Sequence, residues 1–409
     1  MIGSGLGRRF WLLWSATTVA NLGDGISLTA FPLLAIHLTD DARLVALVTT
    51  FRVLPFVIVG LPAGVLLDRL DRRRVGVIAQ IGRAAPVGLM AAAVASDRAT
   101  MGLLVGSAFV VGVGEVFTDG GLPAIVRSVV RTDQLEVANA RIMAAQTVNN
   151  MFIGPPLGAL LFELDQAAPF AAVAAVLGVG AVLLAFLPGS YRPEPDGQHD
   201  DGEGAFRSQL FTGLRYVWAH PVLRPLALSV ALFAFMGEAT NAVFVILATE
   251  RFGFGSLGFG VLLSLDAAAA VTMSFFVARI VARWGHANSM RIAVVAFSVA
   301  TLLLGFTTVA AGAVLAALIQ GAGDPTWNVV SSTIRQRLVP DQVFGRMMTA
   351  YLFLAWGIQP IGAFLGGVIA EAYGAQWVYV MAATGVSSLL IFARPMFHQV
   401  TRAMTAEAA

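Results

Sequence analysis

Long apolar runs separated by short polar turns make up most of this sequence. A helix needs about 20 mostly apolar residues to cross the hydrocarbon core of a bilayer. Runs of this kind lie at 10–37, 43–67, 75–96, 101–130, 137–162, 167–187, 222–248, 257–282, 289–308, 311–337, 345–371 and 376–393. The pattern predicts an all-α membrane protein with twelve transmembrane helices.

The composition agrees with a membrane protein and excludes several other classes. Of the 409 residues, 57% are hydrophobic and only 12% are charged, whereas soluble proteins carry roughly 25% charged residues. Cysteine is absent, which excludes disulfides, thiolate metal sites and cysteine nucleophiles. The short basic N-terminus enters the first apolar run without a small-residue cleavage site, so we expect a retained helix and not a signal peptide.

The placement of arginine predicts the orientation of the spans. All 26 basic residues are arginine. With a cytoplasmic N-terminus, 21 of these 26 fall in cytoplasmic segments, three (Arg43, Arg98 and Arg251) fall outside, and the remaining two lie within spans. Cytoplasmic loops carry an excess of basic residues, so both termini are predicted to be cytoplasmic, in a bacterial inner membrane. This distribution accounts for the pI of about 9.4 without a nucleic-acid partner.

The chain divides into two halves that repeat each other. An acidic linker at 190–205 is followed by an amphipathic stretch at 206–220, which predicts a flexible segment and an interfacial helix. The expected domains are therefore 1–189, the linker 190–221, and 222–409. Leu22-Gly23-Asp24-Gly25 recurs as Met236-Gly237-Glu238-Ala239, and Gly112-Val113-Gly114-Glu115 recurs as Gly321-Ala322-Gly323-Asp324. Duplicated bundles are typical of secondary transporters, with the substrate site near the bilayer midplane.

The repeated positions carry acids near the middle of four spans: Asp24, Glu115, Glu238 and Asp324, each preceded by a glycine. A charge at the bilayer centre costs at least about 2.5–3.5 kcal/mol, so these side chains are expected to face a bundle interior or an aqueous cavity. The adjacent glycines leave room for close helix packing. Asp119 and Asp266 are further in-span acids.

Two interpretations of these acids stay open. Structural ion pairing is available in the first half, where Arg52 is expected near Asp24 and Arg83 near Asp119. The second half has no arginine within a span, so Glu238, Asp266 and Asp324 are expected to lack such a partner. Carboxylates without a cation are candidates for proton uptake and release, which is the functional interpretation.

A charged turn between the second and third spans resembles a signature of the major facilitator superfamily. It runs Gly64-Val65-Leu66-Leu67-Asp68-Arg69-Leu70-Asp71-Arg72-Arg73-Arg74 and is similar to G-x-x-x-D-R-x-x-R-R, with Asp71 where many members have glycine. The resemblance implies a cytoplasmic gate of Gly64, Asp68, Arg69, Arg72 and Arg73. In it Asp68 and Arg69 form the latch, and Gly64 is the point of close packing.

The fifth span resembles the drug:proton antiporter branch of the same superfamily. Gly154-Pro155-Pro156-Leu157-Gly158-Ala159 is similar to the G-P-x-x-G-G/A pattern that is associated with export, which implies a pivot at Gly154, Pro155 and Gly158. The stretches 133–140, 213–221 and 335–346 resemble bacterial macrolide-efflux and multidrug exporters. Many drug antiporters carry an arginine inside the fourth span, whereas here none occurs before Arg127.

The resemblance implies a function and a set of cavity residues. In the superfamily fold, spans 1, 4, 7 and 10 line a central cavity, and these spans carry the glycine–acid pairs. A proton-coupled exporter of amphipathic or lipophilic organic molecules, working by alternating access, is therefore expected. Amides beside aromatic rings suit such substrates, and the expected cavity wall is Phe31, Asn149, Asn150, Asn241, Gln320, Trp327, Asn328, Trp356 and Gln359.

Other functions are less well supported by the sequence. A siderophore exporter of the same superfamily is the main alternative, although an acid-rich cavity disfavours a polyanionic cargo. A prenyltransferase-like membrane enzyme is a distant alternative, because Glu115-x-x-x-Asp119 is matched only by Asp324-x-x-x-Asn328. The expected partners are a small-molecule substrate, protons and the lipid bilayer. We expect a monomer that is not an enzyme and that needs no metal or cofactor.

Overall fold

The chain folds into helices joined by turns. The computed structural model describes residues 5–192 and 203–406, and no strand occurs within these ranges. The chain forms two compact units: unit 1 is Met1–Asp40, Phe51–His199 and Gly255–Ser264, and unit 2 is Asp41–Thr50, Asp200–Phe254 and Leu265–Ala409. Most of the acidic linker, at 193–202, lies outside the described residues.

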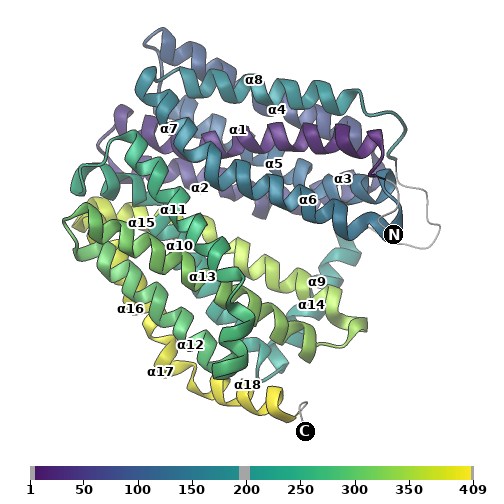
Figure 1. Ribbon diagram of the computed structural model, residues 1–409, viewed down its shortest axis with the longest axis vertical. Helices are drawn as coiled ribbons and strands as arrows, with labels where there is room; N and C mark the ends of the chain where they lie inside the picture. The colour runs from purple at the N-terminus through teal and green to yellow at the C-terminus, as the bar shows by residue number, and fades with distance from the viewer. Residues whose placement is uncertain (1–4, 193–202, 407–409) are drawn as a thin grey trace. The chain divides into compact units, whose positions relative to one another are not determined.

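Unit 1 is built from the helices of the first sequence half. These are α1 (Arg8–Leu38), α2 (Ala42–Ile58) from Phe51 onward, α3 (Gly60–Arg69), α4 (Arg72–Ala95), α5 (Met101–Val129), α6 (Leu135–Thr147), α7 (Gly154–Leu164) and α8 (Ala168–Ala185). Helix α1 packs against α7 and α8, and α4 packs against α5 and α8 (Figure 1). A core that includes Phe10, Leu13, Ile125 and Val126 joins α1, α5, α6 and α8.

Unit 2 contains the helices of the second half. These are α9 (Glu203–Ala219), α10 (Leu223–Ile246), α11 (Ser256–Ser274) from Leu265 onward, α12 (Val277–Phe306), α13 (Ala310–Leu338), α14 (Asp341–Gly357), α15 (Gln359–Tyr373), α16 (Ala375–Ser387), α17 (Leu389–Phe392) and α18 (Arg394–Ala406). Helix α12 packs against α13 and α16, and α10 packs against α15. A core that includes Met290, Val294 and Phe297 of α12 joins α10, α12, α13 and α16.

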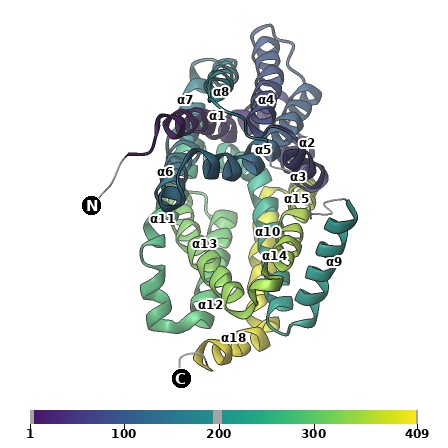
Figure 2. The same ribbon diagram turned by 90° about the vertical axis from the view of Figure 1, so that its right-hand side faces the viewer.

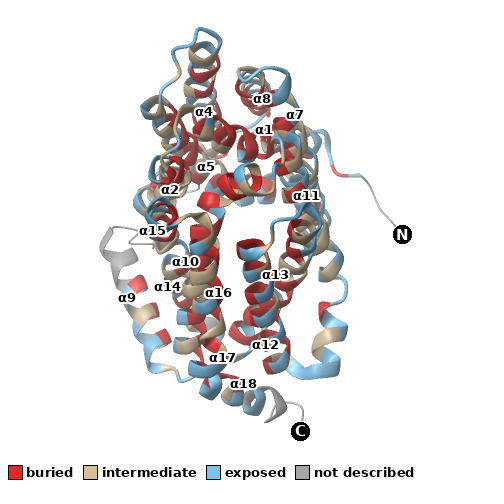
Figure 3. Cartoon of the chain, turned by 90° about the vertical axis from the view of Figure 1, so that its left-hand side faces the viewer, coloured by how far each residue is buried: buried red, intermediate tan, exposed pale blue. Residues whose placement is uncertain are grey.

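The amphipathic stretch after the linker forms the expected helix. Helix α9 packs along α14 (Figure 2) and buries Leu210 and Val217. Phe211 and Trp218 lie exposed, so both buried and exposed residues occur along the helix (Figure 3). Helix α9 therefore has one face on unit 2 and one face with aromatic residues available to the surroundings.

Fewer of the described helices are long and apolar enough to cross a membrane than the twelve apolar runs suggest. Among the described residues, nine helices are long and apolar enough to cross a membrane, and the bent pair Ala42–Ile58 and Pro62–Arg69 makes ten if it is one span. The run at 137–162 is divided by a π-helical turn, Val148–Ile153, into α6 and α7. Twelve spans with cytoplasmic termini therefore stay a prediction.

One predicted span has wrong boundaries. The run at 257–282 is not a single helix, because α11 ends at Ser274 and α12 begins at Val277. A second interruption lies at Gly285, where φ is 75° and the helix axis breaks. Such a φ is readily adopted only by glycine, so the helix axis also breaks within the turn that the apolar pattern places between the runs 257–282 and 289–308.

Candidate functional site

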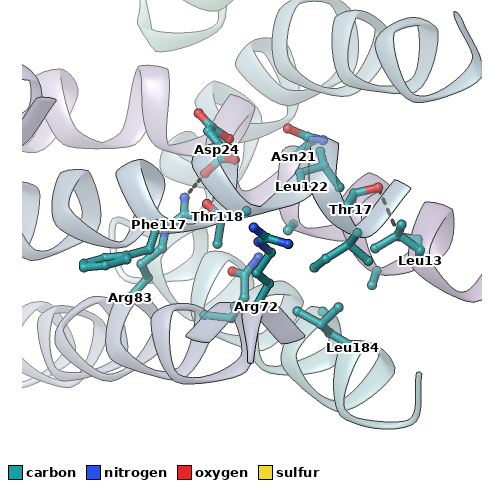
Figure 4. Close-up of a pocket in the computed structure, with 18 of the residues that line it drawn as sticks. Leu13, Thr17, Asn21, Asp24, Arg72, Arg83, Phe117, Thr118, Leu122 and Leu184 are labelled. Carbon is teal, nitrogen blue, oxygen red and sulfur yellow. Dashed lines mark hydrogen bonds and ion pairs between the residues drawn. The ribbon is translucent and has the colours of Figure 1, made fainter. Parts of the chain in front are cut away.

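Four charged side chains from four helices meet inside unit 1. Arg52 Nη2 on α2 lies 2.8 Å from Glu115 Oε1 on α5. Arg83 on α4 forms an ion pair with Asp24 on α1 (Figure 4), and its Nη2 also lies 3.4 Å from Glu115 Oε1. The two arginines and two carboxylates form one connected network, which we call the N-half ion network.

Close packing at two glycines places these side chains. A Cβ on Gly112 would collide with the carbonyl of Arg52, and a Cβ on Gly114 would collide with the methylene groups of Arg83. Helix α5 therefore approaches α2 and α4 closely enough for Glu115 to reach both arginines. Of the other glycines that precede the repeated acids, Gly23 and Gly323 also pack tightly, whereas a Cβ on Gly237 would have no atom within 4 Å.

The N-half ion network differs from the pairing expected from the sequence. Arg52 was expected near Asp24 and Arg83 near Asp119, and each arginine does lie close enough for its charge to interact with that acid. The salt bridges, however, join Arg52 to Glu115 and Arg83 to Asp24. Arg83 is only 2% exposed, and a buried charge needs a compensating partner. Asp24 and Glu115 supply that compensation, while Asp119 forms no salt bridge within the described part of the chain.

Unit 2 repeats the backbone of this arrangement with different charges. Gly321 packs on the carbonyl of Asp266 as Gly112 packs on that of Arg52, so Asp266 takes the place of Arg52. Gly323 packs on α12 near the carbonyl of Ala293, as Gly114 packs on α4 near the carbonyl of Ala79. Phe297 follows Ala293 by four residues as Arg83 follows Ala79, so Phe297 takes the place of Arg83. Two acids, Asp266 and Asp324, therefore stand where unit 1 has an arginine and an acid.

Asp266 and Asp324 form no salt bridge with an arginine among the described residues of the chain. Asp324 lies close enough for its charge to act on Asp266, and Oδ1 of Asp266 is buried without a hydrogen bond. Glu238 is different, because its Oε1 accepts a hydrogen bond from Asn241 Nδ2 at 3.0 Å. At the position in unit 2 that is equivalent to Arg83, the structure has an aromatic cluster. The ring centroid of Phe233 lies 5.3 Å from that of Phe297 and 4.3 Å from that of Trp327.

A pocket of about 60 Å³ in unit 1 reaches the N-half ion network (Figure 4). It is lined by α1, α4, α5, α6 and α8. Its polar lining residues are Thr17, Asn21, Asp24, Arg72, Gln80, Arg83, Thr118, Asp119 and Gln146. The sequence predictions missed Thr17, Asn21, Gln80, Thr118 and Gln146. The spacing of Arg72, Gly76, Gln80 and Arg83 along α4 was the available signal, since it places non-apolar residues on one helix face.

The residues predicted to line a substrate cavity are found in different environments. Phe31 is 2% exposed and its ring meets that of Phe170, and Trp327 is 5% exposed in the aromatic cluster, so both are core residues. Asn149 Nδ2 donates to the Ala145 carbonyl at 2.8 Å, and Asn150 Oδ1 is buried without a hydrogen bond. The remaining predicted residues, Asn241, Gln320, Asn328, Trp356 and Gln359, are partly or fully exposed.

The predicted gate residues in the charged turn between α3 and α4 differ in the contacts that they make. Arg72 Nη2 lies 3.3 Å from Asp68 Oδ1, and Arg73 Nη1 donates to the Leu187 carbonyl at 2.7 Å. Arg69 is exposed at the end of α3. The close packing expected at Gly64 is not seen, because a Cβ there would have no atom within 4 Å.

The predicted pivot in the fifth span lies at a real irregularity. Helix α7 begins at Gly154 directly after the π-helical turn Val148–Ile153. Gly154 and Gly158 pack against Gly25 and Ile26 on α1, and Thr29 Oγ1 donates to the Pro155 carbonyl at 3.1 Å. No group of three acidic or histidine side chains that could hold a metal ion occurs in the described ranges.

Comparison with known proteins shows the family. The model of the Major Facilitator Superfamily matches residues 13–358 and 226–403. The chain is 24% identical over 402 residues to the multidrug efflux pump Tap of Mycobacterium tuberculosis (strain ATCC 25618 / H37Rv), covering 94% of this chain and 92% of that one. It is 19% identical over 404 residues to macrolide efflux protein A of Streptococcus pyogenes, covering 96% and 97%.

A solved structure agrees with the fold. The crystal structure of the nucleoside transporter NupG superposes with a TM-score of 0.75 at 17% identity, covering 97% of this chain and 100% of that one. At that identity the likeness supports the fold alone. Because the family model covers nearly the whole chain, this protein belongs to the major facilitator superfamily of transporters.

Proposed function

We propose that this transporter is a proton-coupled exporter of amphipathic organic molecules in the bacterial inner membrane. One line of support is the relatives, a multidrug efflux pump and a macrolide efflux protein that each align over more than nine-tenths of the chain. The other is the glycine–proline pattern that begins at Gly154. The proposal includes twelve spans, cytoplasmic termini and a division into 1–189, 190–221 and 222–409.

The N-half ion network is the observation that carries proton coupling. Protonation of Asp24 or Glu115 removes a negative charge and leaves Arg83 with one carboxylate in place of two. Breaking one side of a buried ion pair typically costs about 3–5 kcal/mol, which is enough to change how α1, α2, α4 and α5 pack. A bound proton can thereby alter the contacts among these four helices.

The acids of unit 2 support a cationic or neutral substrate. Asp266 and Asp324 stand at the positions of the Arg52–Glu115 pair without an arginine of their own. A positively charged group of a substrate would supply the missing compensation, whereas a polyanion would be repelled. We therefore assign proton exchange to the first half of the sequence and recognition of a substrate cation to the second.

Proton movement driven by a lipophilic cation in proteoliposomes tests this function. We expect Asp24→Asn and Glu115→Gln to abolish proton movement, and Glu238→Gln and Asp324→Asn to weaken binding of the cation. Asp133→Asn, on the exposed turn before α6, is the matched control and should behave like wild type. If all four variants transport like wild type, the site is wrongly assigned. Transport of a siderophore and not of the cation would favour the alternative exporter.

A further inference from the structure

The pocket in unit 1 follows two helices from one end toward their middle. Helix α4 lines it with Arg72, Gly76, Gln80 and Arg83, and α1 lines it from Leu13 to Asp24. Both stretches advance eleven residues, which is about 16 Å at 1.5 Å per residue. The hydrocarbon core is about 30 Å thick. The pocket is therefore long enough to connect the end of α4 at the charged turn with the depth of Asp24.

Two buried polar atoms in the lining form no hydrogen bond with any described residue of the chain. Gln80 is 7% exposed and its Oε1 accepts no hydrogen bond, and Arg83 is 2% exposed with Nε donating none. Leaving such a group unsatisfied costs about 1–3 kcal/mol. A polar cavity can hold one water molecule for roughly every 10–15 Å³ of volume that a water-sized sphere can occupy. The pocket of about 60 Å³ is thus large enough for several waters that satisfy both atoms.

The charged side chains along the pocket lie at its two ends. Arg72 lies near the charged turn with Asp68, and its guanidinium points between α1 and α4, where Asn21 and Thr17 lie (Figure 4). At the other end Asp24, Arg83 and Glu115 belong to the N-half ion network, with Arg52 behind Glu115 and Asp119 beside it. Lining residues from α6 and α8 are Gln146, Gly180 and Leu184, which carry no charge.

We propose that this pocket is a hydrated proton path from the cytoplasmic end of α4 to Asp24, inside the first bundle and separate from the substrate route. The proposal rests on the proposed function. A protonated Asp24 gives its proton to a pocket water, the hydronium leaves past Gln80 and Arg72, and the carboxylate that remains pairs with Arg83. The Arg72–Asp68 pair stands at the mouth, which links the charged turn to proton release.

The absence of native cysteine allows a direct test of hydration. Single cysteines are placed at Thr17 and Leu122, which line the pocket, and at Val87, which is fully buried on α4 one turn beyond Arg83. Everted membrane vesicles are then treated with a small charged methanethiosulfonate. We expect Thr17→Cys and Leu122→Cys to be labelled and Val87→Cys not. If neither pocket cysteine reacts in variants that still fold and transport, water does not enter and the proposal is overturned.

A second measurement concerns Gln80. Gln80→Leu should keep the affinity for a lipophilic cation and lose most of the substrate-driven proton movement, and Gln80→Glu should restore it because it keeps an oxygen for water. Equal proton movement in wild type and Gln80→Leu contradicts the path. If wild type moves no protons at all, the proposed function fails, whereas the labelling result still decides whether the pocket is hydrated.

Discussion

Asp71 joins two segments that lie 120 residues apart in the chain. Its Oδ1 accepts hydrogen bonds from the backbone amides of Arg73 and Arg74 at the start of α4, and its Oδ2 accepts one from the amide of Tyr191 after α8. This residue stands where many superfamily members have glycine, and the sequence alone offered no reason for it. The structure supplies one: Asp71 caps α4 and fixes the beginning of the linker.

Replacing Asp71 should lower stability in a pH-dependent way. Partial burial raises the pKa of Asp71. The hydrogen bonds from the amides of Tyr191, Arg74 and Arg73, together with the charge of Arg73, lower the pKa by more than burial raises it, so the pKa lies below its ordinary value. The ionised form therefore stabilises the fold above the unfolded pKa of about 3.9, and this contribution is lost as the pH falls through the folded value. Asp71→Ala should cost about 0.5–2 kcal/mol at neutral pH.

Thermal unfolding in detergent between pH 3 and pH 7 measures this effect. The difference between wild type and Asp71→Ala should be full at neutral pH and shrink below a pH of about 4. Asp40→Ala removes an exposed carboxylate and should leave the midpoint unchanged. A constant difference across the whole pH range would mean that the charge of Asp71 does not act through these hydrogen bonds.

At the scale of helices, the duplication is visible as one repeated contact. Gly112 on α5 packs on the backbone of Arg52, and Gly321 on α13 packs on the backbone of Asp266. In both units a glycine brings a helix that carries an acid against a helix that carries a charged residue. The contact is retained while the charges differ, so the packing and the electrostatics of the repeats have diverged separately.

Gly112→Ala should therefore disturb α5 more than a glycine substitution elsewhere on that helix. The added Cβ meets backbone, which cannot move aside as a side chain can, and overpacking typically costs about 1–3 kcal/mol. Gly106→Ala on the same helix is the control, because no atom lies within 4 Å of its Cβ. A lower unfolding temperature and lost proton movement are expected for Gly112→Ala alone. Equal behaviour of the two variants would show that the contact does not position Glu115.

The helices show what the sequence could and could not predict. The runs at 10–37, 75–96 and 101–130 match α1, α4 and α5 closely, because apolar length alone defines a span. The break between α11 and α12 was missed because Phe275 and Phe276 are apolar and continue the run. Glycine–acid pairs located the in-span acids, but the partners of Arg52 and Arg83 depend on helix rotation, which the spacing along one chain does not specify.

At the scale of the molecule, each compact unit contains a short segment from the other sequence half. Residues 41–50 of the first half belong to unit 2, and residues 255–264 of the second half belong to unit 1. In unit 2, Glu371 Oε2 accepts a hydrogen bond from the Ala42 amide at 2.8 Å. In unit 1, Glu163 Oε1 accepts one from the Leu257 amide at 2.8 Å. Both amides lie in the first turn of a helix, where no intrahelical acceptor exists.

Glycines reinforce both attachments. Gly367 on α15 packs against Ala46 in the first turns of α2, and Gly260 on α11 packs against the Pro155 carbonyl on α7. Each attachment thus combines a glycine contact with a glutamate that caps a helix of the other sequence half. If the two halves of the sequence separate during transport, each attachment must release.

Release of the α2 attachment can be followed at Ala242. This residue packs against Ala46 and Ala363 and is buried in unit 2, so a thiol there reacts only when the first turns of α2 leave. Loss of the cap in Glu371→Ala should cost about 0.5–2 kcal/mol, which raises the released population roughly 2- to 30-fold. Labelling of Ala242→Cys by an external thiol reagent should accelerate to the same degree. Glu250→Ala, which removes an exposed carboxylate, and Ala382→Cys, buried in the core, are the controls. If Ala242→Cys reacts at one rate with and without Glu371, this glutamate does not hold the segment.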